Sequence, residues 1–245
     1  VTAPGVTFRN FTIDGRKSSL ASGEGIMVMT SGFIAEGLTI KDMPGKAIHI
    51  HSSSTNCIVR NNRIYSPGST AATDGHAIVV HNSSNCKVYN NYIEGTKHSS
   101  IWTQATTLNT EITNNTIVNS LSDAIASDAT GEHILINGNT IISPVGAGIT
   151  ADADSMLVSN NLISGAGTFG IWATLGGNGS SWWGNHITNS VNYGMAIKVD
   201  PSISLAGWSI FSNTILNTSG NTQQIPVYWG VVDKSFKAPE GKEST

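Results

Sequence analysis

An isoleucine recurs along this chain at intervals of 22 to 29 residues, each time within a short alternation of apolar and polar positions. The series consists of Ile13, Ile40, Ile64, Ile93, Ile117, Ile141, Ile163, Ile187 and Ile215. This interval is too short for a propeller blade or an armadillo repeat, and it matches one turn of a three-sided β-solenoid. The pattern therefore predicts an all-β chain that winds into about nine coils.

An asparagine stands two residues before the isoleucine in each of the last seven coils, at Asn62, Asn91, Asn115, Asn139, Asn161, Asn185 and Asn213. Equivalent positions of neighbouring coils lie about 4.8 Å apart, so we expect a ladder of amide hydrogen bonds at a buried bend. A second inward column places Cys57 beside Cys86. We expect two buried free thiols, because stacked strands hold the Cα atoms slightly too close for a good disulfide.

A second strand follows in each coil, and in most coils its first inward residue comes eight positions after the isoleucine of the first series. We assign these inward positions to Ile26, Ile48, Ile78, Ile101, Ile125, Ile149, Ile171 and Ile197. The connections 14–25 and 65–76 are longer than the others and predict loops beside this strand. Insertions on one face of a solenoid often mark its binding face.

The repeat covers residues 1–232, which we expect to form one β-helix domain, with an irregular C-terminal segment at 233–245. Val1 already lies in the repeat without an entry cap, which predicts a fragment of a longer chain. Charged residues make up 12% of the chain, the net charge is −3, and no basic stripe is present. We therefore expect no nucleic-acid partner. No apolar run approaches the roughly 20 residues that span a bilayer, so no membrane partner is expected.

Two carboxylates stand at equivalent outward positions of adjacent coils, Asp128 and Asp152. Like charges at this spacing separate into an acid and a base, which is the arrangement that glycoside hydrolysis requires. Trp102 and Trp172 flank the pair and offer flat apolar surfaces to sugar rings, and Asp123 could add a third carboxylate. A solvated acidic pair and a calcium site remain open alternatives. We expect no cofactor, with calcium as the exception.

Histidines form a second group on the same face. His51 and His81 are expected to be stacked neighbours, with His49 on the strand that leads to His51, and the two long loops bring Arg16, Glu24, Asp74 and His76 nearby. These residues could supply a general base with an orienting carboxylate. A His/His/Asp metal site and the absence of any role are the alternatives, and we assign no metal ligand from the sequence.

The candidate catalytic residues are thus Asp128, Asp152, His51 and His81. The candidate substrate-binding residues are Trp102, Trp172, Gln104, His49, Asp74, His76, Lys198 and Asp200. In this assignment Lys198 follows Trp172 in the same outward column, where it could bind an acidic sugar or act as the base of a lyase.

The repeated NNxI segments, the second strands GKAIHI, GHAIVV and SDAIAS, and the opening VTFRNFTIDG resemble right-handed, single-stranded parallel β-helix proteins of the pectate-lyase-like superfamily. The resemblance covers nearly the whole chain. It implies a polysaccharide bound along one parallel sheet and an extracellular, secreted or virion-associated location. For the phage tailspike depolymerases of the group it also implies a homotrimer. The motifs of polygalacturonases (NTD, DD, GHG and RIK) and of epimerases (DPHD) do not occur here, nor does the arginine and calcium cluster of pectate lyases.

The sequence therefore favours an enzyme that degrades or modifies a polysaccharide, and hydrolysis over elimination. A carbohydrate-binding or adhesive module without turnover remains open, as does a structural fibre domain. The residues do not name the polysaccharide.

Overall fold

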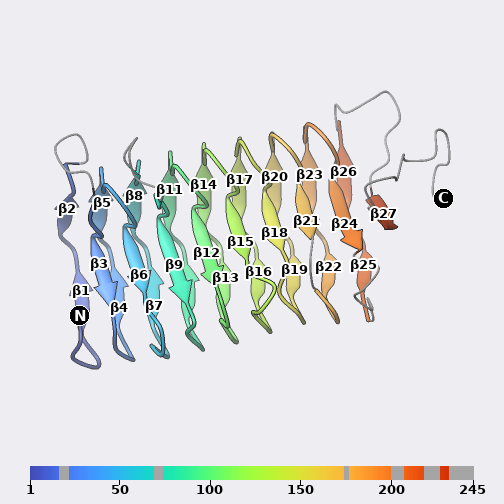
Figure 1. Cartoon of the computed structure of the whole chain (residues 1–245). Coiled ribbons are helices and arrows are strands. Elements are labelled where there is room, and N and C mark those ends of the chain that lie inside the picture. The colour runs from blue at the N-terminus through green and yellow to red at the C-terminus, as the bar shows by residue number, and fades with distance from the viewer. Residues whose placement is uncertain (17–21, 69–73, 174–176, 200–206, 218–226, 232–245) are drawn as a thin grey trace.

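The computed structural model describes residues 1–16, 22–68, 74–173, 177–199, 207–217 and 227–231. In these residues the chain forms three parallel sheets of nine strands each, and successive strands of one coil belong to successive sheets (Figure 1). The nine strands per sheet agree with the coil number expected from the isoleucine repeat. Among the described segments, no helix is long and apolar enough to cross a membrane.

Each sheet is a single stack of short strands. Sheet A contains β1 (Thr7–Arg9), β4 (Ile34–Glu36), β7 (Ile58–Arg60), β10 (Lys87–Tyr89), β13 (Glu111–Thr113), β16 (Leu135–Asn137), β19 (Leu157–Ser159), β22 (Ser181–Trp183) and β25 (Ser209–Phe211). Sheet B contains β2 (Thr12–Asp14), β5 (Thr39–Lys41), β8 (Arg63–Tyr65), β11 (Tyr92–Glu94), β14 (Thr116–Val118), β17 (Thr140–Ile142), β20 (Leu162–Ser164), β23 (His186–Thr188) and β26 (Thr214–Leu216). Sheet C contains β3 (Ile26–Val28), β6 (Ile48–Ile50), β9 (Ile78–His81), β12 (Ile101–Gln104), β15 (Ile125–Ser127), β18 (Ile149–Ala151), β21 (Ile171–Ala173), β24 (Met195–Val199) and β27 (Val227–Val231).

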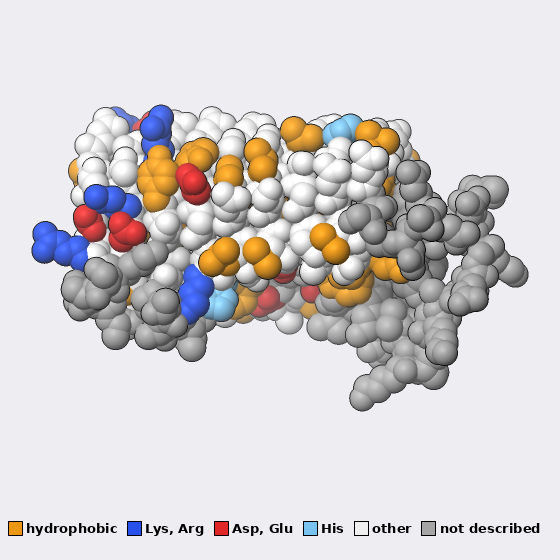
Figure 2. Space-filling view, turned by 90° about the horizontal axis from the view of Figure 1, so that it is seen from above, with side chains coloured by type: hydrophobic (Ala, Val, Ile, Leu, Met, Phe, Trp, Pro, Cys, Tyr) orange, Lys and Arg blue, Asp and Glu red, His pale blue; other side chains and the backbone are white. Residues whose placement is uncertain are grey.

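The core consists of columns of identical or similar side chains that run along the stack. In sheet B the central isoleucines pair coil by coil, as Ile93 does with Ile64 and Ile117, and all three are fully buried. Side chains of neighbouring residues alternate between the two faces of a strand, so strands of sheets A and B such as β4 and β14 bury their central residue, whereas sheet C strands such as β18 and β21 bury their first and third residues. Figure 2 shows rows of hydrophobic side chains along the outside as well, with charged side chains gathered toward the N-terminal end.

The asparagine ladder forms as expected. Asn91 Nδ2 and its backbone N–H both donate to Asn115 Oδ1 at 3.0 Å, and the same pair of bonds recurs from Asn62 to Asn213. Each Nδ2 also donates to a backbone carbonyl of the preceding coil, as Asn115 Nδ2 does to Val88 O at 3.0 Å. The ladder therefore satisfies the buried polar groups of the bend.

The residue before each ladder asparagine takes a left-handed backbone conformation, for example φ 55° at Asn114 and 67° at Gly138. Asparagine and glycine adopt this conformation most readily. At Gly138 a side chain would also collide with Asn114, since an added Cβ would lie 2.5 Å from Asn114 Oδ1. This requirement explains why the repeat reads NN or GN at most coils.

Cys57 and Cys86 lie beside each other, immediately before β7 and β10, and both are buried free thiols as expected. The register differs from expectation at one place. Ile171 pairs with Met195, and Ile197 pairs with Ala173. Ile197 is buried, as assigned, but it lies one inward position farther along the strand. Met195 comes eight residues after Ile187, so the usual spacing holds and the assignment to Ile197 was wrong.

Candidate functional site on the outer face of sheet C

Three rows of side chains cover the outer face of sheet C, and each row takes one residue from each coil. The turn row precedes the strands and consists of Glu24, Lys46, His76, Ser99, Asp123, Ala147, Phe169 and Tyr193. The first strand row consists of Met27, His49, Val79, Trp102, Ala126, Thr150, Trp172 and Ala196, which pair in register. The second strand row follows at the strand ends and includes His51, His81, Gln104, Asp128 and Asp152.

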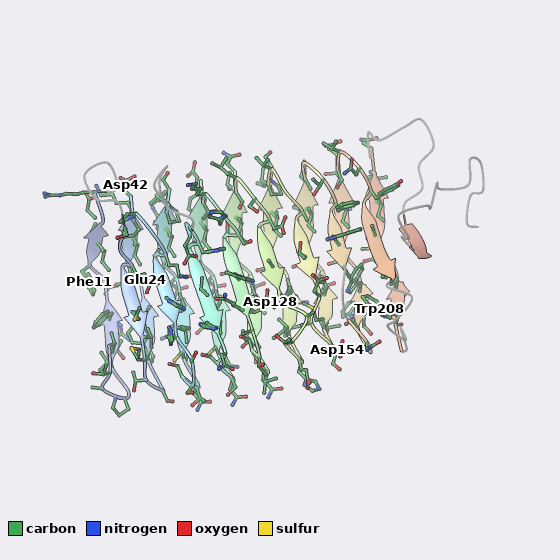
Figure 3. The ribbon with its side chains drawn as sticks, viewed as in Figure 1. Phe11, Glu24, Asp42, Asp128, Asp154 and Trp208 are labelled. Carbon is green, nitrogen blue, oxygen red and sulfur yellow. The ribbon has the colours of Figure 1, made fainter. Side chains whose placement is uncertain are left out.

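Asp128 is held from two sides near the centre of this face (Figure 3). The indole Nε1–H of Trp102 donates to Asp128 Oδ1 at 2.9 Å, and the backbone N–H of Ala105 donates to Oδ2 at 2.9 Å. Both donors come from the preceding coil, on β12 and just after it. The carboxylate is therefore fixed in orientation while it remains partly exposed.

Asp152 occupies the next position of the same row, because Ser127 and Ala151, the residues before the two carboxylates, are paired. Its backbone N–H donates to the buried Ser127 Oγ at 3.0 Å. Asp152 is buried, with 8% of its surface exposed, whereas Asp128 is partly exposed. The stack thus brings the two predicted carboxylates to adjacent coils, with the second one largely covered.

Asp123 takes a structural position instead. Its Oδ1 accepts the backbone N–H of Ala147 at 2.8 Å, and its Oδ2 accepts the Thr150 hydroxyl at 2.8 Å. Both partners belong to the following coil. Asp123 therefore ties two coils together at the turn.

A chain of polar contacts crosses the N-terminal half of the face. Lys46 Nζ lies 3.3 Å from Glu24 Oε1 and also bonds to Asp74 Oδ2. Asp74 Oδ1 lies 3.3 Å from His76 Nε2, and the His76 ring packs on Trp102 with centroids 4.7 Å apart. His76 Nδ1 lies 2.9 Å from Ser99 O. The predicted loop residues Glu24, Asp74 and His76 thus reach this face, whereas Arg16 is exposed, with its backbone N–H on Asp14.

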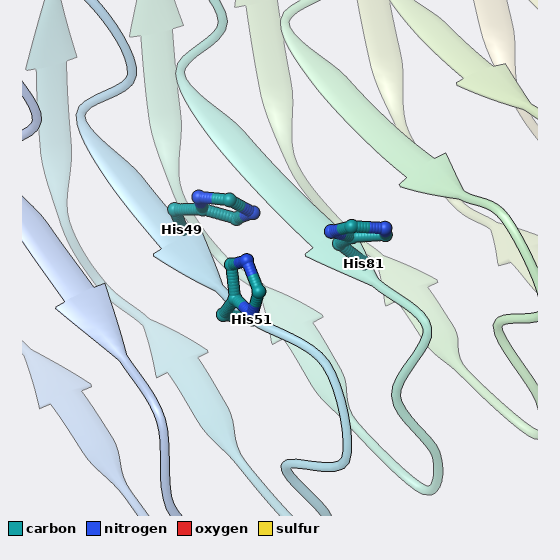
Figure 4. A group of neighbouring side chains, drawn as sticks. All are labelled: His49, His51 and His81. Atoms are coloured by element: carbon teal, nitrogen blue, oxygen red, sulfur yellow. The ribbon is translucent and has the colours of Figure 1, made fainter. Parts of the chain in front are cut away.

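His49, His51 and His81 form a compact group at the ends of β6 and β9 (Figure 4). The ring centroids are 4.9 Å apart for His49 and His51, 5.2 Å for His51 and His81, and 5.8 Å for His49 and His81. His49 Nδ1 lies 3.0 Å from Glu24 Oε1. The neighbouring position, Gln104, pairs with His81, so His51, His81 and Asp128 belong to the second strand row, while His49 belongs to the first.

Burial controls the protonation of these rings. Desolvation lowers the pKa of His49, against the opposing effect of Glu24. Desolvation also lowers the pKa of His81, with a further contribution from His51, while Asp128 raises it. The pKa of His76 falls to about 4 for the same reason, because burial outweighs its contacts with Ser99 and Asp74. These three rings are therefore neutral at neutral pH.

An aromatic stack occupies the C-terminal half of the face. Phe169 lies flat on Trp172, with centroids 4.2 Å apart and an 11° angle between the rings, and Tyr193 continues the stack at 6.1 Å from Phe169. The predicted neighbour of Trp172 was Lys198, but Ala196 takes this place because of the register described above. Lys198 pairs with Gly230 farther along β24, and Asp200 lies outside the described residues.

Sequence reasoning missed three residues of this face, Lys46, Phe169 and Tyr193. All three belong to the turn row, two residues before the first buried residue of a sheet C strand. The alternation of faces would turn this position inward, but the bend before the strand reverses it. A comparison of the same turn position across coils would have found the row.

Outside sheet C, one depression of about 290 Å³ is lined by Arg63, Tyr65, Tyr92 and Glu94 on sheet B. The Tyr92 hydroxyl donates to Glu94 Oε2 at 2.9 Å, a bond that raises the pKa of Tyr92. This hollow shares no residue with the row of histidines and carboxylates.

The sequence comparison settles the family. Residues 2–156, more than half of the chain, match the family described as the right handed beta helix region. This chain is a right-handed β-helix protein. The match confirms the right-handed β-helix fold that the repeats indicated. No curated protein sequence matches this β-helix.

Solved structures with the same fold include proteins of different kinds. A mutant of the periplasmic alginate epimerase AlgG is 16% identical, with a TM-score of 0.61, over 79% of this chain and 48% of the other. An exopolygalacturonase from Thermotoga maritima is 13% identical, with a TM-score of 0.61, over 77% and 49%. The Streptococcus pneumoniae surface protein and adhesin PfbA is 14% identical, with a TM-score of 0.67, over 92% and 66%.

These likenesses establish the architecture of this β-helix and no more, because the identities are low and one fold serves many functions. The chain also spans only about half the length of the epimerase and of the exopolygalacturonase. The function must therefore be argued from the side chains of the face itself.

Proposed function

We propose that this β-helix binds a polysaccharide along the outer face of sheet C and hydrolyses its glycosidic bonds with Asp128 and Asp152. The main support for this proposal is the pair of carboxylates on adjacent coils, of which Asp128 is fixed by hydrogen bonds from Trp102 and Ala105. Partners at equivalent strand positions lie about 4.8 Å apart. This backbone spacing is closer to the roughly 5–5.5 Å between the carboxyl groups of retaining glycosidases than to the roughly 6.5–9.5 Å of inverting ones, so we propose retention of configuration at the cleaved carbon.

The hydrogen bonds suggest separate roles for the two residues. Asp128 accepts N–H groups on both oxygens, so it suits the acceptor roles of nucleophile or base. Asp152 is shielded from water, as the proton-donating carboxyl of glycosidases commonly is. Asp152 would protonate the leaving oxygen while Asp128 attacks the sugar carbon, and water would then release the sugar from Asp128.

The aromatic side chains supply the binding surface in this proposal. Trp102 lies beside the carboxylates, and Trp172 is three strands away, on β21. Three strand spacings correspond to roughly 14 Å, so the two indoles suit an extended chain of sugars better than a single sugar. Fold relatives described as acting on alginate, or as a periplasmic or surface protein, agree with a polysaccharide ligand and with an envelope or extracellular location.

The test is a panel of neutral and acidic polysaccharides, followed by reducing ends and by the ultraviolet absorbance of unsaturated uronates. We expect new reducing ends without that absorbance, and a loss of turnover on the order of 1,000-fold or more in Asp128→Asn and in Asp152→Asn, because each removes one half of an acid and nucleophile pair. Glu111→Gln on sheet A removes an exposed carboxylate and serves as the matched control. Absorbance together with reducing ends would mean elimination and would contradict the proposal.

A binding module without turnover is the second candidate, and the flat stack of Phe169, Trp172 and Tyr193 favours it. The migration of such a module would be retarded in affinity electrophoresis, in a gel that contains a polysaccharide that it binds but does not cleave. Asp128→Asn would then leave affinity nearly unchanged, while Trp172→Ala would weaken it. Wild-type turnover on any member of the panel excludes this candidate.

A further inference from the structure

The side chains of the three histidines on the outer face of sheet C converge. One ligand nitrogen from each of His49, His51 and His81 lies within 4.8 Å of the others. Figure 4 shows a ring nitrogen of each residue turned toward the space between the rings. We propose that this trio binds a divalent transition-metal ion of the zinc type.

The geometry is close to what such an ion requires. Zinc binds imidazole nitrogen at about 2.0–2.1 Å in a tetrahedral arrangement, which places the ligand nitrogens about 3.3 Å apart. The three nitrogens must therefore approach one another by about 1.5 Å at most. His51 and His81 are only partly buried and lie at the ends of their strands, so rotation of these two side chains can provide the movement.

His49 gives an independent indication of a ligand. Its side chain is 7% exposed, and its Nε2 is buried without a hydrogen-bond partner. A buried polar atom without a partner is unfavourable, and a metal ion would supply the missing partner. The other nitrogen, Nδ1, faces Glu24 Oε1 at 3.0 Å. A carboxylate that receives Nδ1–H fixes the tautomer with a free Nε2 lone pair, which is the usual arrangement behind a metal-binding histidine.

The surrounding charges favour a cation. Glu24 and Asp74 carry two negative charges, and Lys46 bridges them with one positive charge. Asp128 acts on His81 from the other side and adds a further negative charge.

The ligand set selects the kind of metal. Three imidazoles suit zinc and its transition-metal neighbours, whereas calcium and magnesium prefer oxygen ligands. Three protein ligands also leave a coordination position for water or a substrate oxygen, as in open zinc sites. The proposal does not depend on polysaccharide cleavage, because metal binding is measured without any substrate.

The experiment is a titration of the whole chain, free of any polyhistidine tag and treated with chelator, with Zn²⁺ in competition with a chromogenic chelator. We expect one equivalent of bound Zn²⁺. We expect affinity to fall on the order of 100-fold or more in His51→Ala and in His81→Ala, and roughly 10–100-fold in Glu24→Gln. His186→Ala removes an exposed histidine on sheet B and should leave the affinity unchanged.

A second measurement needs no variant. Co²⁺ added to the wild-type chain should give the intense visible absorption of a tetrahedral or five-coordinate ion, and Zn²⁺ should displace it, whereas Ca²⁺ should not. The absence of both the Zn²⁺ equivalent and the Co²⁺ spectrum overturns the proposal. Binding that is equally strong in His51→Ala, His81→Ala and His186→Ala overturns it as well, since the ion would then sit elsewhere.

Discussion

Trp102 donates its indole N–H to Asp128 Oδ1 across neighbouring coils, at 2.9 Å. Trp102→Phe keeps an aromatic ring against His76 and removes only this donor. We expect the free energy of unfolding to fall by about 1 kcal/mol, and polysaccharide turnover to fall roughly tenfold through kcat, because Asp128 loses one of two positioning bonds. Urea unfolding and steady-state kinetics measure the two effects. Trp172→Phe is the control, and an equal loss of kcat there would show that aromatic contact alone matters.

The amide ladder predicts a large loss of stability on substitution of the buried Asn115. In Asn115→Ala the N–H groups of Asn91 lose their acceptor, and the Val88 carbonyl loses a donor. Each buried group left unpaired costs about 1–3 kcal/mol, so we expect a loss of roughly 3 kcal/mol or more in urea unfolding. Thr116→Ala, one residue later on the outer face of β14, should change stability by less than about 0.5 kcal/mol. Similar losses in both variants would show that the ladder contributes no special stability.

The coil number, the ladder and the buried thiols could all be predicted, because each depends on one residue type that returns at one position of the repeat. Strand alternation then assigned Trp102, Asp128 and the histidines to a common face, which the paired strands reproduce. The position of Asp128 relative to its donors could not be predicted, since it depends on the rotamer of an indole in the preceding coil.

Two further features escaped prediction for physical reasons. Lys46 and Phe169 of the turn row escaped because the bend before each sheet C strand resets the alternation of faces, and strict alternation would turn their position inward. The register of β24 was misassigned because an isoleucine was preferred over Met195, although both side chains are apolar enough to fill the column and both are buried. Spacing was the better guide there than residue identity.

The buried thiols allow a test of the packing near the N-terminal end. Cys57 and Cys86 are fully buried. A hydrogen bond from the Cys86 thiol lowers the pKa of Cys57 to about 7, and this bond together with burial raises the pKa of Cys86. Burial shields both thiols from reagents in solution. At about pH 8 we expect an aromatic disulfide reagent to detect no thiol in the native protein and both after denaturation in urea. Rapid reaction of one native thiol would contradict the close packing of the third and fourth coils.

The stability of the β-helix should fall on mild acidification because of His76. Burial lowers the pKa of His76 from 6.5 to about 4, and this effect exceeds the opposing attraction of Asp74. Between these two pH values His76 is protonated in the unfolded chain but not in the folded chain. Acid therefore favours unfolding. The contribution is complete above about pH 6.5 and lost as the pH falls toward 4; a difference of 2.5 pKa units corresponds to about 3 kcal/mol.

Urea unfolding at about pH 7 and about pH 5 tests whether the free energy of unfolding falls with acidification as expected. We expect the wild type to lose about 2 kcal/mol more than His76→Gln between these conditions, since glutamine does not titrate. The lowered pKa values of His49 and His81 change the stability of both proteins in the same direction, so the comparison isolates His76. His186→Ala should retain the full wild-type dependence on pH. An identical dependence in His76→Gln would mean that the pKa of His76 is the same in the folded and unfolded chain, with the attraction of Asp74 balancing burial.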